Sequence, residues 1–212
     1  MTADARRLVL LRHGRTAWNA TGRAQGHADV ELDDLGHAQA ELAAPWVAAM
    51  RPAALWSSDL ARARQTAAYV EKETGLTARL DARLREYDVG ERTGLTMAEF
   101  ANRHPEEHAA WLRDRRSEVA GAEETIEVLA RILPAYDDVL AGLGPGESAV
   151  VVTHGAALKV SVLALLGWPQ EQNRSLEGLD NARTAVLEEQ AGSWRLVAWN
   201  AGPDFASVET AR

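Results

Sequence analysis

Two short runs of consecutive apolar residues stand out along the chain, and each leads directly to a His-Gly pair. Residues 8–11 precede Arg12 and His13, and residues 149–152 precede His154 by one position. Such runs are typical of strands buried on both faces, as in parallel sheets. Ligands bind beyond the carboxyl ends of strands in open α/β sheets. We therefore expect the two histidines to share one pocket.

Between these two strands, apolar residues recur at the spacing of helices. This spacing begins over 35–46, after an aspartate that can cap the helix. A short strand follows at 55–56. Residues 57–59 then supply the cap of a second helix, which runs to about Thr74 and stops at Gly75.

The second half of the chain completes an alternation of strands and helices. Helices are predicted over 123–140 and 156–166, each closed by glycine. Residues 184–189 and 194–199 form a hairpin around 190–193, which we place antiparallel at the edge of the sheet.

Between about 79 and 122 the periodicity weakens, and two short helical stretches flank Pro105. We interpret 82–122 as a cap-like excursion within one domain covering 1–212. The fold class predicted is α/β, a three-layer sandwich. It has a mostly parallel central sheet, helices on both faces, an antiparallel edge strand and a small helical excursion over the active site.

Composition restricts the class of protein. The 212 residues are 46% apolar and 25% charged, enough for a sizeable core, and there is no cysteine. The net charge of −8 and the lack of a basic run disfavour nucleic acid and anionic membranes as partners. Without a signal-peptide core or membrane span, we expect a cytoplasmic protein; a homodimer is compatible with the sequence.

Phosphoryl transfer needs positive charge around the oxygens, an in-line nucleophile and an acid for the leaving oxygen. Arg12 and Arg62 each follow an expected strand and carry guanidinium forks suited to phosphate. Taken singly, each arginine is better explained by a surface ion pair, and His13 alone by a structural or solvated histidine. Their combination favours the chemistry.

The motif over 11–19, Leu-Arg-His-Gly-Arg-Thr-Ala-Trp-Asn, resembles the signature of the histidine phosphatase superfamily, which includes the cofactor-dependent phosphoglycerate mutases. The resemblance continues through 22–26, 57–67, 84–86 and 153–155, in the family's order. It therefore spans nearly the whole chain.

This resemblance implies that His13 attacks phosphorus and becomes a transient phosphohistidine. Arg12, Arg62 and His154 would hold the phosphoryl oxygens, with Asn19 as an added donor. The reaction implied is hydrolysis of a phosphomonoester without metal or other cofactor.

Glu86 would protonate the departing alkoxide and then activate water. By residue type alone it would be an ordinary surface glutamate. An acid that works beside a phosphate dianion favours an acidic to neutral pH optimum. Gln25, Gly26 and Gly155 would contact the rest of the substrate.

Two histidines of the excursion have a spacing that zinc sites can use. His104 and His108 are spaced i and i+4, as zinc ligands on a helix can be. Pro105 between them and the lack of a third ligand favour two solvent-exposed histidines instead.

The excursion departs from the family pattern. The common family pattern at this place resembles Gly-Glu-Trp-Glu-Gly, whereas residues 90–94 are Gly-Glu-Arg-Thr-Gly. This difference bears on which substrate the protein takes more than on catalysis by His13. Its arginines could recruit a second acidic group or form a solvated face balanced by acids; they are Arg92, Arg103, Arg113, Arg115 and Arg116.

The tail over 178–182 and 194–200 is similar to the ends of actinobacterial members, which places small phosphosugars and phosphoglycerate derivatives first among small-molecule phosphate esters. Two alternatives remain open. A phosphoglycerate mutase is disfavoured because the excursion is short and lacks lysine. A non-catalytic phosphate-binding pseudoenzyme is disfavoured because the nucleophile and acid are retained.

Overall fold

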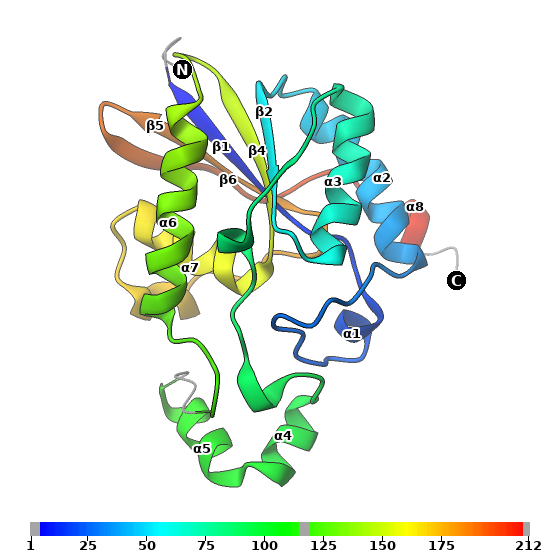
Figure 1. Ribbon diagram of the computed structural model, residues 1–212, viewed down its shortest axis with the longest axis vertical. Helices are drawn as coiled ribbons and strands as arrows, with labels where there is room; N and C mark the ends of the chain where they lie inside the picture. The colour runs from blue at the N-terminus through cyan, green and yellow to red at the C-terminus, as the bar shows by residue number, and fades with distance from the viewer. Residues whose placement is uncertain (1–4, 115–118, 210–212) are drawn as a thin grey trace.

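The computed structural model describes residues 5–114 and 119–209. Its centre is a six-stranded sheet in the order β3-β2-β4-β1-β5-β6 (Figure 1). The strands are β1 (Arg6–Arg12), β2 (Ala54–Ser57), β3 (Arg79–Leu80), β4 (Ser148–Thr153), β5 (Thr184–Gln190) and β6 (Ser193–Ala201). The first four in the sheet order run parallel, and β5 and β6 form an antiparallel pair at one edge.

The register of β1 and β4 brings the two histidines together. Arg12 is paired with Thr153, and the N–H of His13 donates to the Thr153 carbonyl at 3.0 Å. His13 and His154 therefore leave the sheet side by side, as predicted from the two apolar runs.

Helices cover both faces of the sheet (Figure 1). One face carries α2 (Asp34–Ala48) and α3 (Ala61–Thr74), and the other carries α6 (Thr125–Ala141) and α7 (Gly155–Leu165). The shorter elements are α1 (Ala17–Ala20), α4 (Met97–Arg103), α5 (Pro105–Asp114), α8 (Ala206–Glu209) and the 3-10 helices η1 (Ala82–Leu84), η2 (Gly90–Arg92) and η3 (Gln170–Arg174).

Alternation along β1 divides the core in two. Leu8 and Leu10 pack with α6 and α7, while Val9 and Leu11 pack with α2 and α3. All four are fully buried. A strand buried on both faces must be apolar throughout, which is why the run is uninterrupted. The α/β sandwich is confirmed.

The predicted cap of α3 is wrong. The N-cap is Leu60, whose side chain makes no capping bond. Asp29, from a distant loop, accepts the N–H of Ala61 at 2.5 Å instead. Ser58 and Asp59 serve other partners: Ser58 Oγ lies 2.8 Å from His154, and Asp59 pairs with Arg85.

Between Gly75 and α6 the structure holds three short elements that the pattern missed, which are β3, η1 and η2, and two helices that it predicted. β3 is a two-residue, solvent-exposed edge strand, too short to show any periodicity. Helices α4 and α5 meet at Pro105 and lie together at one end of the molecule (Figure 1). The boundaries 82–122 for a cap stay a prediction.

The hairpin of β5 and β6 is confirmed. Its tight turn falls at Ala191 and Gly192, whose φ angles are +51° and +77°. Two residues with positive φ are typical of the type I′ turn, whose twist matches that of paired strands.

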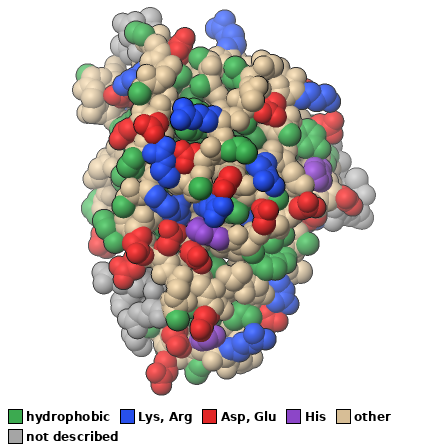
Figure 2. All heavy atoms as spheres, in the orientation of Figure 1, with side chains coloured by type: hydrophobic (Ala, Val, Ile, Leu, Met, Phe, Trp, Pro, Cys, Tyr) green, Lys and Arg blue, Asp and Glu red, His purple; other side chains and the backbone are tan. Residues whose placement is uncertain are grey.

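Basic and acidic side chains are interspersed over the face drawn in Figure 2. Among the described residues of that face, no broad field of one sign develops. Within 5–114 and 119–209, no helix combines the length and apolar character needed to cross a membrane.

Candidate active site

His13 lies at the end of β1 and is only 3% exposed. Its Nδ1 is 2.7 Å from the carbonyl oxygen of Gly14. A carbonyl only accepts, so Nδ1 carries the proton and Nε2 keeps a free lone pair. Burial, and then the charges of Arg62 and Arg12, lower the pKa of His13 well below its ordinary value. The imidazole is therefore neutral and can act as a nucleophile.

Arg62 is fully buried in the first turn of α3. Its Nε donates to His154 Nδ1 at 3.2 Å, and its two terminal nitrogens donate to the carbonyls of Ala28 and Gly26, each at 2.8 Å. Burial lowers the pKa of Arg62 to about 10, which leaves it charged near neutral pH. Since a guanidinium has five N–H groups, two remain for a further acceptor.

Arg12 carries an unsatisfied donor at the same place. One terminal nitrogen donates to the Leu179 carbonyl, while Nε is buried without a hydrogen-bond partner. A buried unpaired N–H costs free energy, so an acceptor oxygen is expected to bind there. Gly155 allows this packing, because a Cβ on it would lie 3.1 Å from that Nε.

His154 is the N-cap residue of α7 and has no exposed surface. Its Nδ1 accepts from Arg62, so Nε2 carries the proton and donates to Ser58 Oγ at 2.8 Å. The rings of His154 and His13 are 5.2 Å apart. Burial, and then Arg62 and His13, lower the pKa of His154 well below its ordinary value. Both imidazoles are therefore neutral.

Glu86 reaches the site from the segment between η1 and η2. Its carboxylate accepts the N–H groups of Ala156 and Ala157, at 3.0 and 2.8 Å, in the first turn of α7. The N–H of Tyr87 is a third donor, at 3.0 Å. The carboxylate therefore lies beside the turn that follows His154.

Three further predicted residues border this group. Asn19 Oδ1 accepts from Thr16 and Asn181, and its Nδ2 has no partner among the described residues. Gln25 Oε1 is buried and unpaired. The chain turns sharply at Gly26, with φ +52°, so that its carbonyl meets Arg62. Among the described residues, Asn19 thus keeps an unpaired donor and Gln25 an unpaired acceptor.

All nine predicted site residues lie in this one region, and their roles stay predictions. The sequence interpretation missed Asn181, whose Nδ2 donates to the His13 carbonyl at 3.1 Å. Only the resemblance of the 178–182 tail pointed to that segment. It also missed Arg131 and Glu123, which hold the segment carrying Glu86.

The expectation that His104 and His108 are solvent-exposed is wrong. Both are half-buried and pack against Phe100, at ring distances of 5.6 and 6.0 Å. Phe100 itself belongs to a small apolar core with Leu95 and Val119. Among the described residues, no group of three or more His, Asp or Glu could hold a metal ion.

Arg92, which departs from the family pattern, lies in the same cluster. Its guanidinium is 5.7 Å from the ring of Phe100 and 5.8 Å from that of Trp111. Burial lowers the pKa of Arg92. Arg103 is exposed. Arg115, Arg116 and the side chain of Arg113 lie outside the described residues.

The chain is similar to known proteins along nearly its whole length. The model of the histidine phosphatase superfamily (branch 1) matches residues 8–202. The chain is 36% identical to glucosyl-3-phosphoglycerate phosphatase of Mycobacterium tuberculosis over 96% of this chain and 98% of that protein. It is 32% identical to metal-independent phosphoserine phosphatase of Arabidopsis thaliana, over 97% and 86%. A structure of mycobacterial glucosyl-3-phosphoglycerate phosphatase complexed with VO3 is similar with a TM-score of 0.87, 38% identity and coverage of 93% and 100%.

Proposed function

The chain belongs to the histidine phosphatase superfamily (branch 1) and is a phosphomonoester hydrolase, and we propose that His13 is its nucleophile and Glu86 its acid and base. The substrate class proposed is small phosphorylated metabolites, with a phosphosugar or phosphoglycerate derivative first.

In the first step the phosphoryl oxygens bind to the buried donors. The unpaired Nε of Arg12, the two free N–H groups of Arg62 and Nδ2 of Asn19 are available to them. His13 Nε2 then attacks phosphorus as the bond to the ester oxygen breaks, and Glu86 gives its proton to that oxygen. The products are an alcohol and a phosphohistidine.

In the second step water replaces the alcohol. Glu86, now a carboxylate, accepts a proton from the water as its oxygen attacks phosphorus. The bond between Nε2 and phosphorus breaks, and the lone pair returns to His13. Phosphate leaves, and Glu86 is protonated again for the next ester.

The observation that carries this proposal is the state of His13. Its proton is held on Nδ1 by the Gly14 carbonyl, and its pKa is lowered, by burial first. A neutral imidazole with a free Nε2 lone pair, beside two guanidiniums that favour an anion, is suited to attack phosphorus.

The choice of substrate class rests on Gln25 and on the relatives. Gln25 Oε1 is a buried acceptor without a donor, and a hydroxyl of a sugar or glycerate would satisfy it. Glucosyl-3-phosphoglycerate phosphatase is the relative at 36% identity. A panel of glucosyl-3-phosphoglycerate, phosphoserine and sugar phosphates, compared by kcat/KM, tests this; the highest value for an ester without a neighbouring hydroxyl would contradict it.

The mechanism is tested with p-nitrophenyl phosphate in EDTA. The native chain is expected to keep its full rate, and His13→Ala is expected to lose at least about 10³-fold of it. Inhibition by EDTA would contradict a metal-independent reaction. Absence of turnover with every ester would indicate a binding protein, and formation of 2-phosphoglycerate from 3-phosphoglycerate would indicate a mutase.

A further inference from the structure

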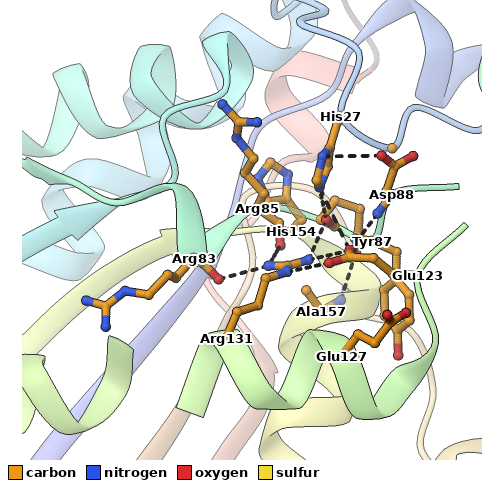
Figure 3. Close-up of polar contacts among 12 residues, drawn as sticks. His27, Arg83, Arg85, Tyr87, Asp88, Glu123, Glu127, Arg131, His154 and Ala157 are labelled. Carbon is orange, nitrogen blue, oxygen red and sulfur yellow. Dashed lines mark hydrogen bonds and ion pairs between the residues drawn. The ribbon is translucent and has the colours of Figure 1, made fainter. Parts of the chain in front are cut away.

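The segment that carries Glu86 is held by one arginine of a different element. Arg131, in α6, donates through one terminal nitrogen to the carbonyls of Arg83 and Arg85, at 2.8 and 2.7 Å. The other terminal nitrogen donates to the carbonyl of Glu86 at 2.8 Å (Figure 3). Three carbonyls on and before the proposed acid therefore converge on a single guanidinium.

The remaining N–H groups of Arg131 bind one carboxylate. Nε donates to Glu123 Oε1 and a terminal nitrogen donates to Glu123 Oε2, both at 2.8 Å. All five N–H groups of the guanidinium are thus used, which only arginine can do. The side chains of Arg131 and Glu123 are 18% and 21% exposed, so water competes little for these bonds.

Glu123 extends the same network to the residues after Glu86. Its Oε2 also accepts the N–H of Asp88 at 2.8 Å, and its own N–H donates to the Asp88 carbonyl at 2.9 Å. Burial acts to raise the pKa of Glu123, but the hydrogen bonds from Arg131 and Asp88 lower it overall. The carboxylate therefore stays ionised and paired with Arg131.

The carbonyl oxygen of Glu86 accepts a second hydrogen bond, from His27. His27 Nε2 lies 2.8 Å from it and must donate, since a carbonyl only accepts (Figure 3). The two lone pairs of this carbonyl are then occupied by His27 and Arg131. The backbone at Glu86 is fixed on both sides, and its carboxylate reaches Ala156 and Ala157 from that point.

We propose that Arg131, aligned by Glu123, is a positioning residue that sets where the Glu86 carboxylate meets the leaving oxygen. This inference rests on the acid role of Glu86 given above. A segment without regular secondary structure has no ladder of its own to fix an acid. The guanidinium supplies that rigidity, and displacement of a reacting group by about 1 Å can cost on the order of 10²-fold in rate.

The readout is dependence on the leaving group. Phenyl phosphate and p-nitrophenyl phosphate have similar shapes, but phenolate leaves poorly without a proton whereas p-nitrophenolate leaves readily. Loss of the acid therefore lowers kcat/KM more for phenyl phosphate. A purely structural defect, which lowers the fraction of folded enzyme, reduces both values by the same factor.

The variants are Arg131→Met, Arg131→Lys and Glu86→Gln, with Arg83→Met as the matched control. Within the described residues, the Arg83 side chain bonds only Asp81 and Asp138, and it points away from the guanidinium of Arg131 (Figure 3). For Arg131→Met we expect kcat/KM on phenyl phosphate to fall on the order of 10²-fold, about tenfold more than on p-nitrophenyl phosphate. Arg131→Lys should lie between this variant and the native chain, and Arg83→Met should match the native chain.

Equal losses on the two esters for Arg131→Met, alongside a selective loss for Glu86→Gln, would overturn the positioning role alone. Equal losses for Glu86→Gln itself would overturn its acid role, and the positioning role with it. If Arg131→Met does not fold, Glu123→Gln replaces it. The side-chain amide of that glutamine would place an N–H group against the N–H donors of Arg131 and Asp88, which disturbs the alignment of Arg131. The same selective pattern is expected from that variant, and its absence would count against the proposal.

Discussion

The two buried histidines should make the stability of the protein depend on pH. His13 and His154 are 3% and 0% exposed, and burial, followed by the charge of Arg62, lowers both pKa values well below 6.5. In the unfolded chain both imidazoles are hydrated and bind a proton as the pH falls through about 6.5. The folded chain does not bind these protons, so acidification favours unfolding.

The magnitude follows from the number of protons. Each proton bound only by the unfolded chain lowers the free energy of unfolding by about 1.4 kcal/mol per pH unit. Between pH 7.5 and 5.0 each histidine contributes about 2 kcal/mol, and the pair about 4 kcal/mol, while both stay neutral in the fold. The lowered pKa values of Asp59 and Asp81 act at lower pH, because their ordinary value is 3.8.

Urea denaturation at pH 7.5 and 5.0, followed by tryptophan fluorescence in phosphate-free buffer, measures this difference. The double variant His13→Asn with His154→Asn should lose most of the pH dependence. His37→Asn, at a half-buried position outside the site, should keep it. A native chain whose free energy of unfolding changes by less than about 1 kcal/mol over this range would refute the reasoning.

Three further substitutions have defined outcomes. Gly155→Ala places a methyl group 3.1 Å from Arg12 Nε and should raise KM for p-nitrophenyl phosphate about tenfold; an unchanged KM would contradict the assigned donor. Asn181→Ala removes the donor to the backbone carbonyl of His13 and should lower the free energy of unfolding, measured in urea, by about 1 kcal/mol. An unchanged free energy of unfolding would contradict this prediction. Gly26→Ala combines positive φ with a Cβ 2.7 Å from Val89 Cγ2. It should cost about 1–3 kcal/mol in the same assay, whereas native stability would show that the loop adapts.

Much of the fold could be predicted because the pattern of apolar residues reports burial directly. Residues 8–11 of β1 and 149–152 of β4 are all apolar because both faces of these strands are covered, and α3 ends at Gly75, whose φ of +71° suits glycine. β3 could not be predicted, since two exposed residues at an edge need no particular side chains. The cap of α3 was missed because its acceptor, Asp29, is distant in sequence.

Some residues of the site could likewise be predicted from the sequence, and others could not. His13 and His154 could be paired because strand ends in a parallel sheet meet at one edge. Arg62 was a candidate because it follows an expected strand, and the motif resemblance supplied Glu86. The role of Arg131 had no sequence signal. Its partners are backbone carbonyls, which every residue has, so only the folded arrangement reveals them.

The central claim is that the phosphoryl group passes through His13. Its most direct test is to mix native chain with a radiolabelled phosphate ester, quench in alkali within one turnover, and map the labelled peptide. Label is expected on His13 in the native chain, and no label is expected in His13→Ala. Hydrolysis without any labelled peptide, or label on another residue, would contradict it.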